Sequence, residues 1–82
     1  MPKIYAICVT HNAGTDFDKE RIIENGIEIG DKIELENARV GGWFTDIWLV
    51  GYEEHFNSVF FDFVDENGEE YDIYSDEDFR DY

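Results

Sequence analysis

Hydrophobic and polar residues alternate along much of this chain, a pattern typical of β-strands whose two faces meet different surroundings. The first run, residues 3–10, is almost continuously apolar and rich in β-branched side chains, so it predicts a buried strand. Residues 51–58 are mostly polar and predict a loop. Glycine-containing turns separate the other runs. Together the runs predict five short strands, at residues 3–10, 32–36, 43–50, 59–65 and 69–74.

One segment departs from this alternation and predicts a short helix over residues 15–25. Thr15 is a good N-cap residue, and Asp18 places a negative charge at the positive end of the helix dipole. Asn25 and Gly26 form a stop signal, since both residue types are common where helices end. After the turn residues 11–14, the segment is therefore expected to form a helix of at most about three turns; a plain loop with one helical turn is the alternative.

Two turn signals precede the C-terminus. Asn67 and Gly68 are typical of a type I′ hairpin turn, because both residue types tolerate a positive φ. Ser75 followed three residues later by Asp78 is similar to a capping box, so a last helical turn is expected to run through Phe79.

Short strands with one longer excursion after the first are typical of a small, partly open SH3-like barrel with one short helix. The segment 27–36, an apolar lead-in followed by Gly-Asp and an alternating strand, is similar in style to strands of such barrels. An α+β sheet with one covering helix is the alternative. The 82 residues allow a single domain, 1–82, with one modest core.

The outward face of the predicted sheet is more apolar than an exposed face needs to be. In the run 59–65, alternation places Val59, Phe61 and Phe63 inward and Phe60 outward. Across the last three runs, acids are mixed on the outward face with large apolar residues: Phe44, Trp48, Val50, Phe60, Val64 and Tyr74. Either the helix and the C-terminal residues cover this face, or it contacts a partner protein or a second copy of this chain.

Charge narrows the possible partners. The chain has 21 Asp and Glu residues against six Lys and Arg, a formal net charge of -15. Such a charge repels nucleic acids and anionic membranes, so direct binding to either is not expected. A hydrophobic content of 43%, with 17% aromatic residues, excludes a disordered acidic tail. Because no apolar run is long enough for a membrane span or a secretory signal, a cytoplasmic domain is expected.

Few residues suggest catalysis or metal binding. Cys8 and His11 are three residues apart at the end of a strand, where they would point to opposite sides, so Cys8 most simply fills the core. His55 is expected in an exposed loop. The acidic turn at residues 65–69 lacks the spacing of an EF-hand calcium loop. We therefore expect no catalytic residue, no cofactor and no metal site.

Acidic residues are concentrated at the end of the chain, where residues 62–82 hold ten acids and one base, Arg80. Alternate residues of a strand are about 6.6–7 Å apart, similar to successive phosphates along one DNA strand. Solubility is the other explanation, although it does not need a charge this large. The expected surface for a basic partner protein combines acids and aromatics: Asp62, Glu66, Glu69, Glu70, Asp72, Asp76, Glu77, Asp78, Trp48, Phe60 and Tyr74.

In its small size, its acidity, its interleaved aromatic residues and its lack of a catalytic motif, the chain resembles small acidic phage-encoded anti-defence proteins. These are the anti-CRISPR and anti-restriction proteins that mimic DNA. The resemblance implies a non-enzymatic inhibitor in the host cytoplasm that occupies the basic nucleic-acid-binding cleft of a defence nuclease. An oligomeric nucleotide-binding sponge and an accessory structural domain are the alternatives.

Overall fold

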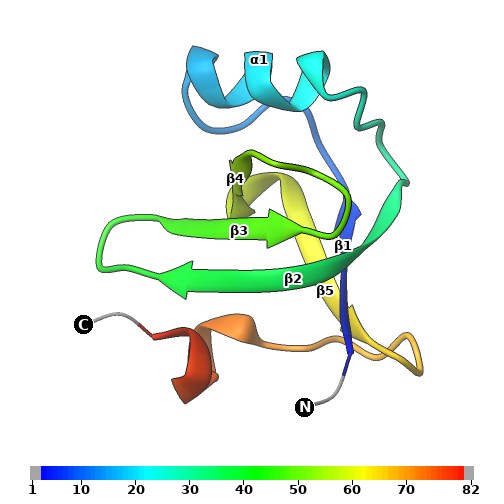
Figure 1. Cartoon of the computed structure of the whole chain (residues 1–82), viewed down its shortest axis with the longest axis vertical. Helices are drawn as coiled ribbons and strands as arrows, with labels where there is room; N and C mark the ends of the chain where they lie inside the picture. Colours follow the sequence, from blue (N-terminus) through cyan, green and yellow to red (C-terminus); the bar gives the residue numbers. More distant parts are fainter. Residues whose placement is uncertain (1–2, 81–82) are drawn as a thin grey trace.

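Five antiparallel strands form one open sheet in the computed structural model, which describes residues 3–80 (Figure 1). The order across the sheet is β4-β3-β2-β1-β5, so β4 and β5 are its edges. In chain order the strands are β1 (Ile4–Cys8), β2 (Lys32–Val40), β3 (Thr45–Leu49), β4 (His55–Asn57) and β5 (Phe61–Asp65). The predicted mainly-β fold, a small, partly open barrel of five strands with one helix, is therefore confirmed.

The long strand β2 belongs to both halves of the sheet and bends it. Its first half pairs with β1, with Glu34 opposite Tyr5, and its second half pairs with β3, with Ala38 opposite Ile47. The register shifts between Leu35 and Asn37, and an irregularity of this kind bends a strand and increases its twist. The short 3-10 helix η1 (Ser58–Phe60) then joins the two edge strands directly, which folds the sheet over the core.

The predicted helix is confirmed as α1 (Asp16–Glu24). Thr15 caps it, because its hydroxyl oxygen accepts a hydrogen bond from the Asp18 N–H at 3.2 Å while the Asp18 carboxylate accepts from the Thr15 N–H at 3.0 Å. Gly26, with φ at 70°, follows the last turn. The helix buries Ile22 and contacts the edge strand β4.

The core lies between the inward faces of the strands, and the C-terminal segment closes one end of it. Thr45, Ile47 and Leu49 on β3 are all buried, as the alternation predicts. Two short 3-10 helices follow β5: η2 (Ile73–Ser75), which places Ile73 in the core, and η3 (Glu77–Phe79), which places Phe79 there. Figure 1 shows this segment, coloured orange to red, at the end of the barrel opposite α1.

Two strand predictions are wrong. Residues 69–74 form only an isolated bridge, Val64 with Glu70, before the chain leaves β5 and enters η2. The Asp72 carboxylate causes this departure, because it accepts hydrogen bonds from the Tyr74 N–H and the Ser75 hydroxyl and so holds a turn. The fifth strand is instead β4, inside the predicted polar loop, where Phe56 is the one buried residue of three.

The predicted faces of residues 59–65 are also wrong at their start. The 3-10 turn of η1 shifts the alternation, so Phe60, Phe61 and Phe63 all point inward and Val59 points outward. Asn57 holds this turn by accepting a hydrogen bond from the Val59 N–H at 3.1 Å. Phe60 has an exposed fraction of 0%, so it belongs to the core and not to a partner-binding surface.

Aspartates define the two remaining turns. Gly68, with φ at 81°, has a positive φ but Asn67 does not, so the predicted type I′ turn is wrong. Asp65 holds the turn instead by accepting from the N–H groups of Asn67 and Glu69. The last helical turn is present as η3, but its cap is Asp76, not Ser75.

Candidate functional site

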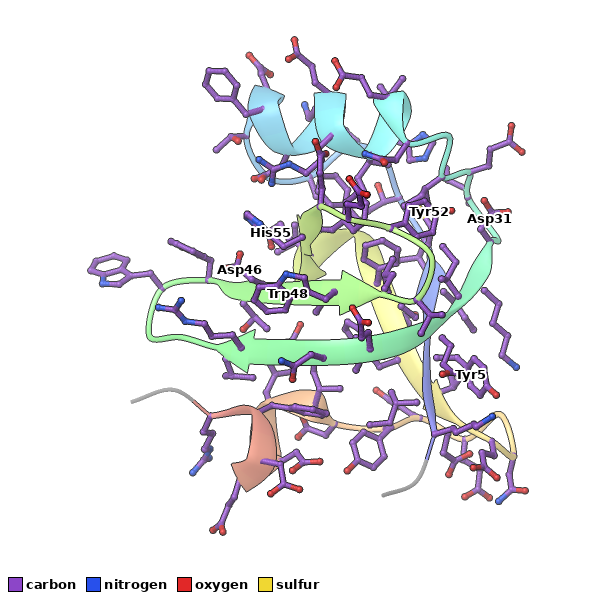
Figure 2. All side chains as sticks on the ribbon, in the orientation of Figure 1. Tyr5, Asp31, Asp46, Trp48, Tyr52 and His55 are labelled. Atoms are coloured by element: carbon purple, nitrogen blue, oxygen red, sulfur yellow. The ribbon has the colours of Figure 1, made fainter. Side chains whose placement is uncertain are left out.

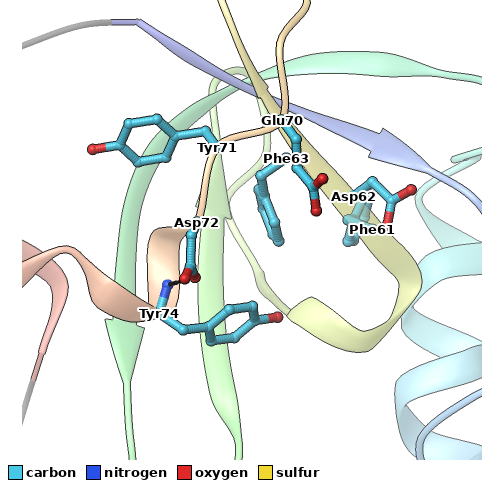
Figure 3. A pocket seen from close by; sticks show the side chains of 7 residues that line it. All are labelled: Phe61, Asp62, Phe63, Glu70, Tyr71, Asp72 and Tyr74. Atoms are coloured by element: carbon cyan, nitrogen blue, oxygen red, sulfur yellow. Dashed lines mark hydrogen bonds between the residues drawn. The ribbon is translucent and has the colours of Figure 1, made fainter.

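A groove opens where the C-terminal segment leaves β5. Two backbone hydrogen bonds join them, from the Asp65 N–H to the Glu69 C=O at 2.8 Å and from the Tyr71 N–H to the Phe63 C=O at 2.9 Å. Beyond Tyr71 the segment turns away. The resulting cavity of about 390 Å³, here called the acidic groove, is lined by Phe61, Asp62, Phe63, Glu70, Tyr71, Asp72 and Tyr74 (Figure 3).

The acidic groove combines aromatic and anionic groups. Phe61 and Phe63 line it from the core side. In the view of Figure 3 the Glu70 carboxylate lies beside the ring of Phe63, Asp62 lies next to Phe61, and Asp72 lies on the opposite side of the groove, next to Tyr74. These three carboxylates are exposed, and none forms an ion pair with a lysine or arginine within residues 3–80. The groove therefore presents concentrated negative charge beside aromatic rings, an arrangement suited to a cation.

Tyrosines support the groove. The Tyr74 hydroxyl donates a hydrogen bond to the Ser58 Oγ at 2.9 Å, which ties η2 to η1. The Tyr71 hydroxyl donates to Asp76 at 2.6 Å; this hydrogen bond, with burial and the charges of Asp76 and Asp78, raises the pKa of Tyr71. Tyr74 nevertheless keeps 44% of its surface exposed, so it is available for contact with a partner.

Some of the predicted acids hold the fold. Asp72 caps η2 and Asp76 caps η3, each accepting from the N–H two residues later. Asn57 does the same for η1 with a neutral amide. Capping therefore requires an oxygen acceptor at these positions but no negative charge.

The remaining predicted residues lie along the C-terminal segment or beside it. Glu66 and Glu69 occupy the turn after β5, where Glu66 accepts from the Lys3 N–H at 3.2 Å. Glu77 and Asp78 are exposed on η3. Trp48 lies outside the acidic groove, on β3; it shares a second cavity of about 330 Å³ with Asp78 and Phe79.

One exposed aromatic site lies outside the predicted partner-binding surface, although the sequence already placed Phe44 on an outward face and suggested Trp43 as a partner contact. Trp43 and Phe44, at the tip between β2 and β3, have exposed fractions of 98% and 64%. The sequence signal was the glycine pair before them, because a glycine-rich hairpin tip projects its side chains beyond the core. On α1, Phe17 is exposed as well.

Lys3, Arg21 and Lys32 lie in separate parts of the fold, whereas Arg39 and Arg80 line the same cavity as Trp48. Lys3 pairs with Glu34 at 3.7 Å, Arg21 lies within 4.0 Å of carboxylates of Asp18 and Glu54, and Lys32 lies over the ring of Tyr5. Binding of a nucleotide by converging basic residues stays a prediction.

Cys8, His11 and His55 are all at least partly buried and contact other parts of the fold. Cys8 is buried, and burial raises the pKa of its thiol. The His11 Nε2 lies 2.8 Å from the Ile27 carbonyl oxygen. His55 is not in an exposed loop as predicted: it is half-buried on β4, with its ring centroid 5.9 Å from that of Trp48 (Figure 2). Within residues 3–80, no three His, Cys, Asp or Glu side chains are grouped to hold a metal ion.

No helix in the described part of the chain is long and apolar enough to span a bilayer. Of the ten acids at the end of the sequence, Asp81 lies outside the described residues.

Comparison with curated proteins and with solved structures found no match. Comparison with protein families matched residues 3–82, which include all of the strands, the helix and the acidic groove, to the family described as Bacteriophage T4 protein Y07B. This chain therefore belongs to the family of the bacteriophage T4 protein Y07B.

Proposed function

We propose that this chain is a non-enzymatic inhibitor that occupies the basic nucleic-acid-binding surface of a bacterial defence nuclease, in the host cytoplasm, and so excludes DNA from it. The observation that carries the proposal is the set of exposed carboxylates along the C-terminal segment that form no ion pair within residues 3–80: Asp62, Glu66, Glu69, Glu70, Asp72, Glu77 and Asp78. Membership of a phage family supports a role inside a bacterial host.

Electrostatics favours a basic partner over a purely solubilising role. Charges crowded on one segment repel each other and destabilise a small fold. Local structure accounts for Asp72 and Asp76, since each uses both carboxylate oxygens as acceptors. The exposed Glu69, Glu70 and Glu77 cap no helix, so local structure does not explain the rest of the charge. A partner rich in lysine and arginine would relieve the repulsion and would be attracted over a long range, which speeds association.

Aromatic residues beside the acids, the exposed Tyr74 and the half-buried Trp48, supply the short-range contacts that slow dissociation. Trp48 lines the same cavity as Asp78, and Tyr74 lines the acidic groove with Asp72. Trp and Tyr are enriched among the residues that contribute most binding energy at protein interfaces. The acids would thus determine the rate of encounter, and the aromatics the lifetime of the complex.

The test is capture of host proteins on the immobilised chain, followed by elution with a 30-base-pair duplex DNA. We expect a nuclease to be retained, to be released by the duplex, and to be inhibited by the free chain in cleavage of a labelled duplex. A retained protein that the duplex does not displace, or an absence of any nucleic-acid-binding protein, would overturn DNA mimicry.

A matched pair of variants separates a local surface from overall charge. Neutralising three acids outside the acidic groove, Glu69→Gln, Glu77→Gln and Asp78→Asn, leaves the caps intact. We expect roughly tenfold slower association with the captured nuclease at low salt. The control carries the same net charge change at exposed acids elsewhere: Glu20→Gln, Glu24→Gln and Glu53→Gln. Equal association rates for the two variants would contradict the proposal.

A further inference from the structure

We propose that the acidic groove binds an extended basic segment of the partner, which adds to the open edge of β5 as a further strand and places an arginine side chain between Asp62 and Glu70. This inference rests on the proposed function and specifies the part of the partner that the groove recognises. It follows from three observations: the edge of β5 is largely unpaired, backbone groups of β5 face the groove, and carboxylates surround the groove.

One edge strand of the sheet is covered by a helix, and the other is largely open. Helix α1 covers the edge strand β4: the Arg21 guanidinium donates to the His55 C=O at 3.4 Å, and the Asn57 side chain donates to Asp18 at 3.3 Å. The other edge strand, β5, pairs with the C-terminal segment only between Phe63 and Asp65. Natural sheets usually cover or block their edges, because an open edge is a template for another strand.

Backbone groups of β5 point into the acidic groove. The Val9 N–H donates to the Phe60 C=O at 2.9 Å, and in the antiparallel register this places the N–H and C=O of Asp62 toward β1. The backbone groups of Phe61 and Phe63 therefore point the other way. Two of them are already used: the Phe61 N–H donates to the Ser58 C=O in η1, and the Phe63 C=O accepts from the Tyr71 N–H. The Phe61 C=O and the Phe63 N–H face the groove. Within residues 3–80, no hydrogen bond joins the Phe63 N–H or the Phe61 C=O to the C-terminal segment. An added strand would use both groups, as in other cases of β-strand addition.

The negative charge of the acidic groove favours a basic segment as its ligand. Two backbone hydrogen bonds alone give little affinity, so side chains must supply most of it. Asp62 on β5 and Glu70 on the facing segment are both exposed, have no cationic partner within the described residues, and line the same cavity as Phe63 and Tyr74. A planar guanidinium can bind carboxylates in a bidentate manner and stack on an aromatic ring, whereas a lysine ammonium acts as a point charge.

The inference is tested by titrating the 15N-labelled chain with an acetylated, amidated Val-Arg-Val-Arg-Val peptide, and by following its amide resonances. We expect the largest shifts, with slowed hydrogen exchange at the Phe63 N–H, in residues 61–63 and 70–72. A peptide with citrulline in place of arginine should bind at least about tenfold more weakly, since it keeps the shape but lacks the charge. Shifts centred on Trp43 and Phe44, or equal binding of the two peptides, would overturn the inference.

Variants of the groove complete the test. Asp62→Asn with Glu70→Gln should weaken peptide binding about tenfold, while Glu20→Gln with Glu24→Gln, of equal charge change, should leave it unchanged. A dispersed amide spectrum establishes that each variant is folded. If the groove variant retains the nuclease as tightly as its control, and DNA still displaces that nuclease, the groove inference fails and the proposed function stands. If no DNA-displaceable nuclease is retained but the peptide binds the groove, the proposed function fails instead.

Discussion

Removing the side chain of Ile73 tests whether the acidic C-terminal segment is part of the fold or an appendage to it. Ile73 lies in η2, has an exposed fraction of 0%, and belongs to the same core cluster as the strands. If this packing closes the end of the barrel, Ile73→Ala must destabilise the whole domain. If the segment is only loosely attached, the substitution changes little.

The magnitude follows from burial. Replacing a buried isoleucine by alanine costs about 2–5 kcal/mol, from lost transfer energy and the cavity that remains. Ile73 is in a short turn at one end of the core, where the segment can move to fill part of the space, so we expect about 2–3 kcal/mol. For a domain of 82 residues, whose free energy of unfolding is about 4–12 kcal/mol, this is a large fraction.

Urea unfolding followed by tryptophan fluorescence provides the measurement. Trp43 is almost fully exposed, so most of the change in signal should come from the half-buried Trp48. The matched control is Ile29→Ala, the same substitution at an isoleucine with an exposed fraction of 63%, for which we expect less than about 0.5 kcal/mol. A midpoint for Ile73→Ala that matches this control at equal slope would refute the structural role of the segment.

Two further predictions concern single side chains. Burial opposes ionisation of Asp18, but hydrogen bonds from Thr15 and Asn57 and the charge of Arg21 outweigh it and lower the pKa of this carboxyl. The stabilisation by ionised Asp18 is therefore present above the unfolded-state pKa of about 3.9 and is lost as the pH falls through the lower folded-state pKa. At pH 7, Asp18→Asn should lower the free energy of unfolding by about 1 kcal/mol. In acid the urea midpoints of the variant and of the unsubstituted chain should converge, and midpoints that stay apart would contradict this. Burial raises the pKa of the Cys8 thiol. At pH 8 this thiol should therefore react with an aromatic disulfide reagent only as the chain unfolds. A reaction rate in the folded chain equal to that of a free thiol would show that Cys8 is accessible.

Local signals predicted the parts of the fold that depend on near neighbours. Thr15 was predicted as the N-cap, and Gly26 as part of the stop signal. Each lies within four residues of the groups it contacts, so sequence spacing was sufficient; the return hydrogen bond to Asp18 was not predicted. The alternation of Thr45, Ile47 and Leu49 likewise predicted the buried face of β3. These elements required no knowledge of what packs against them.

The errors arose where one turn changed which side a residue faces. The 3-10 turn η1 rotated Phe60 into the core, and Asp72 ended the predicted last strand before Ile73 could continue it. In a strand the side-chain period is two, so a shift of one residue reverses every face that follows. The three-residue strand β4 has one buried residue, Phe56, which is too few for an alternating pattern to appear.

The sequence by itself determined the net charge, its concentration near the C-terminus, the cap of α1 and most of the strands. Only the tertiary structure decided that a groove opens between β5 and the C-terminal segment beyond Tyr71, that Trp48 lies elsewhere beside η3, and that β5 keeps an open edge. The physical reason is that caps and alternation depend on residues within about four positions. Which distant carboxylates meet depends on strand register and on where the chain end packs to close the barrel, and neither is encoded within a short stretch.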